Sequence, residues 1–451
     1  MHVLWGLGGM AVLLALAFAL SSDRRAISPR TIAGALAIQV AFGVIVLYWE
    51  AGQAALRAAS SGVQAVIDSS REGIEFLFGP VLPSEGLVFA FQVLPVIIFF
   101  ASLTAVLYHW NVLQWVVRIV GGGLRRALGT SRAESMNAAA NIFVGQTEAP
   151  LVIRPYIAGM TRSEFFAVMV GGLSTVAGSV LVGYSLLGAR LEYLIAASFM
   201  AAPGALLMAK IIIPETETTE TGSAETVMAT TREDEREHRV AESGAADRRT
   251  GEESTDAAGR TGDTGRDRPR RLSSGDPTHE HRNVIDAAAA GASDGLRLAL
   301  NIGAMLIAFI SLIALANLLL GQIGELFGYA GLTLERILGY VFSPVMFVTG
   351  VPWNEAVEAG SFLGQKVVLN EFVAFSSFGP QAETFTPRTS AIITFALTGF
   401  ANLGSLGILL GGLGGLAPER RSEIAQLGLR AVLAGTLANL MSATIAGILL
   451  G

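Results

Sequence analysis

Residues 141–156, NIFVGQTEAPLVIRPY, place polar side chains inside an otherwise apolar part of the chain. Gln146, Thr147 and Glu148 stand together here, and Asn141 precedes them. A carboxylate at membrane depth is costly and is usually kept for a function, so this segment is the first candidate for contact with a substrate. A glycine and a proline flank the three polar residues and favour an unwound tip with free amide and carbonyl groups.

Three further apolar stretches carry polar groups: GGLSTVAGSVLVGY at 171–184, LNEFVAF at 369–375 and TGFANLGS at 398–405. Non-helical backbone at membrane depth is tolerated where it lines a cavity or is buried in protein. We therefore expect these stretches to meet the first segment at one site near the middle of the membrane. The side chains concerned are Thr175, Ser179, Asn370, Glu371, Phe400, Asn402 and Ser405.

The residue types at this predicted site suit a neutral, polyhydroxylated ring compound. Glutamate carboxylates and Asn or Gln amides hydrogen-bond to sugar hydroxyls and to the edges of bases. Phe400 can stack on a planar ring. A strongly anionic substrate would instead require an arginine or lysine among these groups.

The composition indicates an integral membrane protein, because 52% of the 451 residues are hydrophobic and only 15% are charged. About 20 apolar residues cross a bilayer, and by this measure the chain has eight spans. Two interrupted apolar stretches, near 133–158 and 343–378, are predicted to be broken, re-entrant hairpins. The spans are expected near 3–20, 31–49, 87–108, 165–188, 191–213, 296–320, 390–412 and 424–450.

Several classes of chemistry find no support in the sequence. There are no cysteines, and three of the five histidines, at 238, 279 and 281, lie in one polar segment, so metal catalysis is not expected. GGLGG at 411–415 lacks the lysine of a nucleotide-binding loop. A membrane-embedded transferase remains a remote alternative, but it would need an acidic metal-binding pair or a nucleophile with a base inside the spans. A channel is disfavoured by the two broken hairpins.

Charge placement predicts the topology. Arg24, Arg25 and Arg30 follow the first apolar run, which places the N-terminus outside the cell and argues against a cleaved signal peptide. The stretch 50–86 then falls outside as a loop, and the basic stretch 118–132 falls inside. Residues 112–128 are amphipathic enough to form an interfacial helix on the inner surface.

Residues 215–282 are expected to be a disordered cytoplasmic insert, because they are charged and nearly free of large apolar groups. This insert carries 17 acidic residues and 11 arginines, and the rest of the chain is balanced at 20 of each sign. The predicted domains are scaffold spans at 1–110, the interfacial helix at 111–130, a first transport repeat at 131–213, the insert at 214–284, a scaffold span with an extracellular helix at 285–342, and a second transport repeat at 343–451.

The chain repeats itself on either side of the insert. In each half a broken hairpin precedes a glycine-rich span with a Gly-Ser step, and a further span follows. The single span at 296–320 reverses the side from which the second hairpin enters. The two halves are therefore predicted to be inverted repeats, the arrangement found in many secondary transporters.

The four motifs GQTEAPLVIRPY, GGLSTVAGSVLVGY, LNEFVAF and TGFANLGS, in this order, resemble the concentrative nucleoside transporter family. The resemblance runs from about residue 30 to the C-terminus, skipping the insert. It implies an all-α homotrimer in the inner (plasma) membrane, with eight spans, two re-entrant hairpins and an elevator-type motion, and no nucleic-acid partner. Two features depart from the family's pattern: the acidic insert is longer than the usual loop, and the stretch between Glu371 and Asn402 is short. These departures bear on regulation and on the spacing of the domains, and neither lies in a binding motif.

The resemblance also implies roles for individual residues. Nucleobase contacts fall on Gln146, Thr147, Glu148, Val180 and Phe400, and ribose contacts fall on Glu371, Asn402 and Ser405. The family's sodium site falls on Asn141, Val144, Thr175 and Val176, partly through backbone carbonyls.

The coupling ion has two alternatives. A carboxyl group in a partly desolvated site can titrate near neutrality, so Glu148 or Glu371 could carry a proton. Asn141 and Thr175 supply neutral oxygens, which a hard cation requires and a proton site does not. We expect a sodium-driven nucleoside symporter without an organic cofactor, with proton coupling as the alternative.

Overall fold

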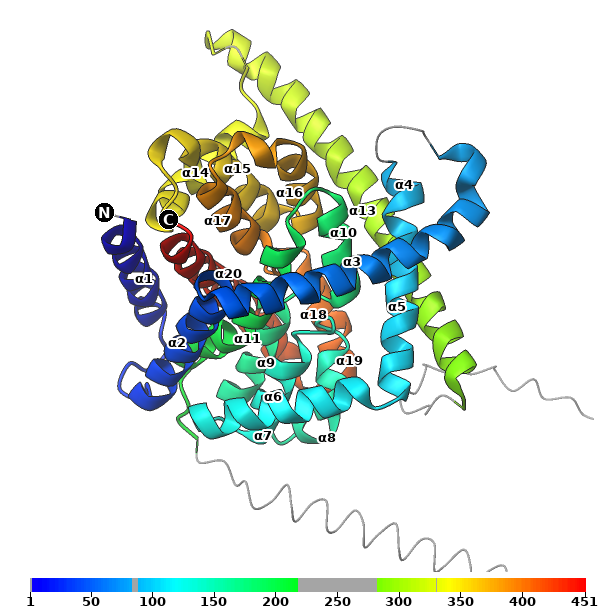
Figure 1. Cartoon of the computed structure of the whole chain (residues 1–451). Coiled ribbons are helices and arrows are strands. Elements are labelled where there is room, and N and C mark those ends of the chain that lie inside the picture. Colours follow the sequence, from blue (N-terminus) through cyan, green and yellow to red (C-terminus); the bar gives the residue numbers. More distant parts are fainter. Residues whose placement is uncertain (1, 83–87, 218–281, 330) are drawn as a thin grey trace, which may run out of the picture. The chain divides into compact units, whose positions relative to one another are not determined.

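The structure is a computed structural model (Figure 1), and all of its regular secondary structure is helical within the part of the chain that it describes. The described residues are 2–82, 88–217, 282–329 and 331–451. Residues 218–281, nearly all of the predicted acidic insert, lie outside them.

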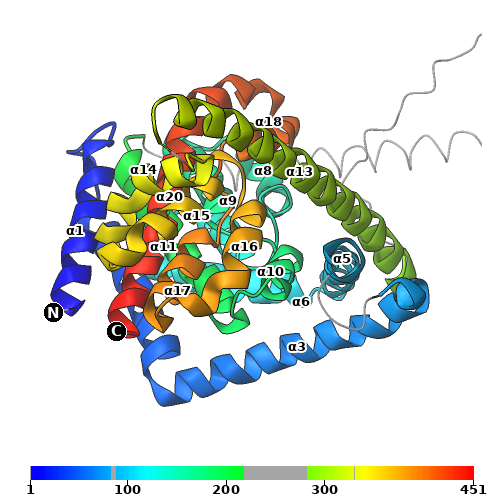
Figure 2. The same ribbon diagram turned by 90° about the horizontal axis from the view of Figure 1, so that it is seen from above.

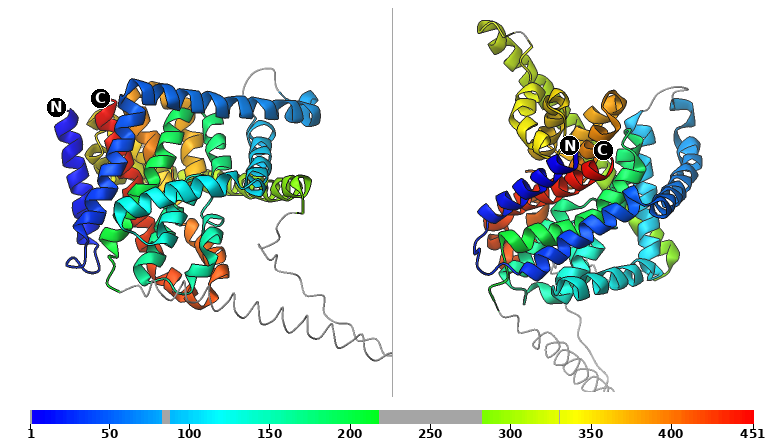
Figure 3. Two further views of the ribbon diagram at one scale, coloured as in Figure 1. Left: turned by 60° about the horizontal axis from the view of Figure 1, so that its bottom comes forward. Right: turned by 60° about the vertical axis from the view of Figure 1, so that its left-hand side comes forward.

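The first two helices pack against the end of the chain. Helix α1 (His2–Ala19) lies beside the last helix, α20 (Arg421–Leu449), as Figure 3 shows. The contact is close because α1 presents a glycine to α20: a Cβ at Gly6 would collide with the Ile448 side chain. Helix α2 (Pro29–Gly43) starts with a proline after the capping residue Ser28 and continues as a π-helical turn, Val44–Tyr48.

The prediction of a loop at 50–86 is wrong for most of this stretch, because residues Glu50–Phe78 form helix α3. Figure 2 shows α3 running along one side of the helices toward α5, and α3 contacts both α5 and α11. Its sequence is rich in alanine and other helix-forming residues, but its apolar positions are spaced on one face only. A search for continuous apolar runs therefore misses it.

Helices α5 (Leu94–His109) and α13 (Val284–Leu326) pack against each other and cross (Figure 1). A short helix, α4 (Phe89–Gln92), leads into α5. At the crossing α13 presents Gly291 and Gly295, where an added Cβ would meet the α5 backbone at 2.8 Å. Small residues four apart allow helix backbones to approach in this way. Helix α13 has 43 residues and is thus longer than the span expected at 296–320.

Helix α6 (Val112–Leu128) coincides with the expected amphipathic helix and precedes the first repeat. Next come α7 (Arg132–Ala140), an unwound turn at 141–148, and a second arm formed by a 3-10 segment (Ala149–Ile153) and α8 (Arg154–Ile157). The following span is broken at 175–177 into α9 (Arg162–Ser174) and α10 (Gly178–Leu186), and α11 (Leu191–Ile212) completes the repeat.

The second repeat follows α13 in the same order. Its elements are α14 (Leu334–Val348), α15 (Trp353–Val368), a turn at 369–370, α16 (Glu371–Phe378), a 3-10 segment (Gly379–Thr384), α17 (Pro387–Leu397), a break at 398–404, α18 (Ser405–Gly411), α19 (Leu413–Leu416), a 3-10 segment (Pro418–Arg420) and α20. The expected hairpin at 343–378 thus begins inside α14, and its two arms are α15 and α16.

The two repeats run in opposite directions, as predicted. In Figure 1, α7 and α8 lie at one end of the bundle, and α15, α16 and α17 lie at the other. The broken spans α9/α10 and α17/α18 consequently approach the centre from opposite ends. Helix α20 packs against both α9 and α17, which places it between the two broken spans.

Seven helices of the described chain are long and apolar enough to cross a membrane, counting α9 with α10 as one. They coincide with seven of the eight expected spans. The eighth expected span, 390–412, is not one continuous helix, because the break at 398–404 divides it into α17 and α18.

Candidate functional site

Glu371 is the centre of a buried polar group. It opens helix α16, and Asn370 caps this helix by accepting a hydrogen bond from the Val373 amide at 2.9 Å. One oxygen of the Glu371 carboxyl accepts from the Tyr184 hydroxyl at 2.9 Å, and the other accepts from Asn402 Nδ2 at 2.9 Å. A carboxylate has about four lone-pair sites, so both oxygens keep accepting capacity for a ligand.

Asn402 is itself held in place by the start of α18. Its Oδ1 accepts a hydrogen bond from the Ser405 amide at 2.8 Å, which directs its Nδ2 toward Glu371. All three residues are at least 95% buried. The structure therefore brings Glu371, Asn402 and Ser405 together, although they come from two separate motifs.

Tyr184 is a residue of this group that the sequence analysis missed. Its ring is fully buried and stacks on Phe375 at 4.5 Å between centroids, with Phe372 at 4.8 Å. It lies on α10 one helical turn after Val180, so both side chains project from the same face. The only sequence signal is a lone hydroxyl-bearing aromatic at the end of an apolar run.

The tip of the first hairpin carries the other predicted contacts. Gln146 is buried against Gly172 of α9, and its Oε1 has no hydrogen-bond partner among the described residues. The Thr147 side chain lies against Gly412, just after α18, and Glu148 accepts a hydrogen bond from the Gly145 amide at 3.2 Å. Unlike Gln146, both Thr147 and Glu148 are exposed. They are thus open to a ligand approaching the tip.

The predicted ion ligands lie where the first hairpin turn meets the break in the first span. The Gly178 amide donates to the Phe143 carbonyl at 3.0 Å, so residues 141–145 and 175–178 run side by side. Asn141 donates through Nδ2 to the Asn137 carbonyl at 3.0 Å, and its Oδ1 is left without a partner among the described residues. Thr175 donates its hydroxyl proton to the Gly171 carbonyl at 2.8 Å, which leaves the oxygen lone pairs available.

Two backbone oxygens complete this candidate set. Within the described chain, the carbonyls of Val144 and Val176 accept no hydrogen bond from another residue. Buried carbonyl groups are normally paired. Together with Asn141 and Thr175 they offer four neutral oxygens, the ligand type that hard cations prefer.

The two broken spans are joined directly. The Phe400 amide, in the second break, donates a hydrogen bond to the Thr175 carbonyl, in the first break, at 3.2 Å. Phe400 is half-buried. The predicted stacking residue and a predicted ion ligand are therefore in contact. No hydrogen bond among the described residues connects Glu148 with the Glu371 group.

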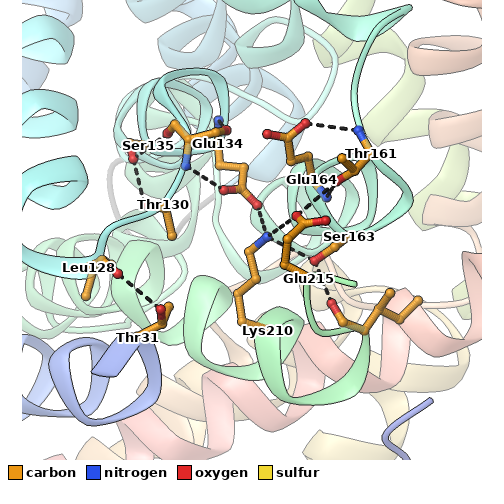
Figure 4. Close-up of polar contacts among 12 residues, drawn as sticks. Thr31, Leu128, Thr130, Glu134, Ser135, Thr161, Ser163, Glu164, Lys210 and Glu215 are labelled. Carbon is orange, nitrogen blue, oxygen red and sulfur yellow. Dashed lines mark hydrogen bonds and ion pairs between the residues drawn. The ribbon is translucent and has the colours of Figure 1, made fainter. Parts of the chain in front are cut away.

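The base of the first hairpin is fixed by a second polar cluster, shown in Figure 4. Ser131 and Thr161 begin α7 and α9 with capping boxes, in which Glu134 and Glu164 accept from the capping amides at 2.9 and 3.0 Å. Lys210 of α11 forms an ion pair with Glu134 and donates to Ser163 Oγ at 2.9 Å. This cluster ties α7 and α9 to α11.

Replacing Lys210 with methionine should destabilise the protein, because it leaves the buried Glu134 carboxylate without its cation. Breaking a buried pair in this way costs about 3–5 kcal/mol. Thermal unfolding in detergent should show a clearly lowered Tm. The control is Arg190→Met, which breaks the exposed Arg190–Glu192 pair and should cost at most about 1 kcal/mol. Equal Tm values for the two variants would contradict the assigned role of Lys210.

Family models cover most of the chain. Residues 193–447 match the model described as "Na+ dependent nucleoside transporter C-terminus", and residues 8–81 match the corresponding N-terminus model. Residues 90–191, which include the first hairpin and the first broken span, match a model described as "Nucleoside recognition".

Similar proteins and structures agree with these matches. The chain is 45% identical to the nucleoside permease NupC of Helicobacter pylori, over 99% of this chain and 98% of that protein. It is 36% identical to sodium/nucleoside cotransporter 1 of Mus musculus, over 98% of this chain and 63% of that longer protein. The solved structure of CNTnw in an inward-facing substrate-bound state has 49% identity and a TM-score of 0.85, covering 100% of this chain and 98% of that one.

These relatives are transporters and permeases, so the transferase alternative is set aside. A family model matches more than half of the chain, and the identity to the Helicobacter pylori permease is 45% over almost the whole chain, so the family is shown. The protein is a multi-pass membrane transporter and belongs to the concentrative nucleoside transporter family.

Proposed function

We propose that this protein is a symporter that imports nucleosides across the inner (plasma) membrane, driven by a sodium gradient. The observation that carries the proposal is the buried Glu371–Asn402–Ser405 group. Its Asn402 lies in the same break as Phe400, whose amide donates to the carbonyl of the candidate ion ligand Thr175. Membership of the family supports nucleosides as the substrate class, and the "Na+ dependent" description of its model supports the ion.

In this proposal the ribose binds to the Glu371 group. Two adjacent hydroxyls of the sugar donate to the free lone pairs of the carboxylate, whose position is fixed by Tyr184 and Asn402. Because these partners are already in place, the site loses little freedom when it binds the sugar. Ser405 adds a hydroxyl beside Asn402.

The base occupies the space between the first hairpin tip and the second break. Gln146, Thr147 and Glu148 offer an amide, a hydroxyl and a carboxylate to the base edge, and Phe400 stacks on its face. Val180 supplies an apolar wall one helical turn before Tyr184.

Sodium binds to Asn141, Thr175 and the carbonyls of Val144 and Val176. The donor assignments of Asn141 and Thr175 leave their oxygens free to face a cation. The N-terminus lies outside, the protein is a homotrimer, and the hairpins and broken spans move together as an elevator-type transport domain at 131–213 and 343–451. Solved CNTnw structures in inward-facing and outward-facing states support such a movement.

The test of the substrate class is ligand-induced stabilisation of the purified protein. Uridine and adenosine should each raise Tm in a concentration-dependent way, because a ligand that binds only the folded state stabilises it. Free ribose and free uracil should have much smaller effects at the same concentrations. Stabilisation by an amino acid or a hexose, with none by any nucleoside, would contradict the proposal.

Replacing Phe400 with leucine should weaken nucleoside binding and leave ribose binding unchanged. Stacking requires the planar base and is worth about 0.5–1.5 kcal/mol beyond the buried area, so uridine affinity should fall about 3- to 10-fold. Isothermal titration of the variant with uridine and with ribose checks this. Equal losses for both ligands would remove the stacking role from Phe400.

A further inference from the structure

Lys366 is a fully buried lysine that has no place in the site described above. It lies in the last turns of α15, and its side chain is among the largest in the core with no exposed surface. Its amino group donates to the Ala396 carbonyl and to Asn439 Oδ1, both at 2.8 Å. It thus links the second hairpin to α17 and to α20.

Asn439 extends this link to both helix breaks. Its Nδ2 donates to the Ser174 carbonyl at 2.7 Å and to the Thr398 carbonyl at 2.8 Å. Ser174 is the last residue of α9, and Thr398 follows the last residue of α17. One side chain therefore holds the C-terminal ends of the two half-helices.

These contacts answer a specific energetic need. The last carbonyls of a helix have no partner within the helix, and at membrane depth water does not replace the missing donors. Lys366 and Asn439 together donate four hydrogen bonds, three of which go to these carbonyls at the two breaks. Gly399 permits the arrangement, because a Cβ there would collide with the Asn439 amide.

The same contacts lie between the ion ligands and the substrate ligands. Ser174 directly precedes Thr175 and Val176, and Thr398 is two residues before Phe400. Asn439 therefore connects the two breaks directly, in addition to the bond between Phe400 and Thr175.

We propose that Lys366 and Asn439 form a positioning pair that couples sodium occupancy at the first break to nucleoside affinity at the second. The inference rests on the proposed sodium symport and deepens it. The pair touches neither ligand. It keeps the two breaks in one arrangement, so that an ion that orders the first break also orders the second, and linkage makes the effect reciprocal.

The test is the sodium dependence of uridine affinity, measured by isothermal titration at low and high NaCl with choline chloride holding the ionic strength. The variants are Lys366→Met, which removes the amino group at similar length, and Asn439→Asp, which keeps an acceptor for Lys366 but loses the donor to Ser174 and Thr398. The control is Ser442→Ala, three residues further along α20, which loses a buried hydrogen bond to Gln39 at 2.9 Å away from both breaks.

Sodium should strengthen uridine binding by about 5-fold or more in the wild type and in Ser442→Ala, within the usual range of coupling. In Lys366→Met and in Asn439→Asp this ratio should fall to about 2-fold or less, whereas a merely structural role would lower Tm and leave the ratio unchanged. If one variant does not fold, the other still decides.

If sodium strengthens uridine binding more than 5-fold in the wild type and equally in both variants, the positioning role of Lys366 and Asn439 is overturned and the proposed symport still stands. If the uridine affinity of the wild type does not depend on sodium, the proposed ion coupling is overturned, and the positioning role of Lys366 and Asn439 is overturned with it.

Discussion

Replacement of Glu371 by glutamine should weaken uridine binding by about 10- to 100-fold, since a hydrogen bond to a charged group is worth about 1.5–3 kcal/mol. The amide has nearly the same shape as the carboxylate, but an NH2 group, which donates hydrogen bonds, replaces one of the two accepting oxygens. That donor would face either the Tyr184 hydroxyl or Asn402 Nδ2, both of which donate to Glu371 in the structure. The variant loses an acceptor for ribose and also the geometry that positions the remaining one.

Isothermal titration with uridine measures this effect, and gel filtration checks assembly. The matched control is Tyr184→Phe, which removes one of the two bonds to Glu371 and leaves the carboxylate in place. We expect a loss of at most about 10-fold there, in line with a single hydrogen bond worth about 1 kcal/mol. Wild-type uridine affinity in Glu371→Gln would remove Glu371 from the substrate site.

The double change Asn141→Ala with Thr175→Val should abolish the sodium dependence of uridine binding. It removes two side-chain oxygens from the four in the candidate ion site. The carbonyls of Val144 and Val176 remain, and they are too few to replace the hydration shell of a hard cation. Uridine affinity at high NaCl should fall to the value that the wild type shows without sodium.

A threonine elsewhere serves as the matched control for this change. Thr394 is buried in α17, and its hydroxyl donates to the Ser390 carbonyl at 2.8 Å, the same back-bond that Thr175 makes to Gly171. Thr394→Val should therefore keep the sodium effect. If the double variant responds to sodium as the wild type does, Asn141 and Thr175 do not hold the coupling ion.

Much of this architecture could be predicted from sequence because membrane spans are long apolar runs. The broken elements could be predicted for a different reason: glycine and proline beside polar residues are out of place in a plain span. Helix α3 could not be found in this way, because only one of its faces is apolar. The bounds of the second hairpin were also misplaced, because α14 and α15 both resemble hairpin arms in sequence and join at a bend of 116°.

The candidate site shows a similar limit. The four motifs predicted which residues gather at the breaks, and the structure joins Glu371 to Asn402 and Thr175 to Phe400. It could not be predicted that Tyr184 fixes Glu371 or that Asn439 spans both breaks. Those contacts connect residues 187 and 265 positions apart, and no local spacing reports on such pairs.

The most direct test of sodium-driven nucleoside import is uptake of radiolabelled uridine into proteoliposomes. An inward sodium gradient at equal pH should drive uridine above its equilibrium level, and an inward proton gradient without sodium should not. Replacing external sodium with choline should reduce uptake to the level of empty liposomes, and collapsing the sodium gradient with an ionophore should limit uptake to the equilibrium level. Concentrative uptake that follows the pH gradient and ignores sodium would contradict the account and make Glu148 or Glu371 the proton carrier.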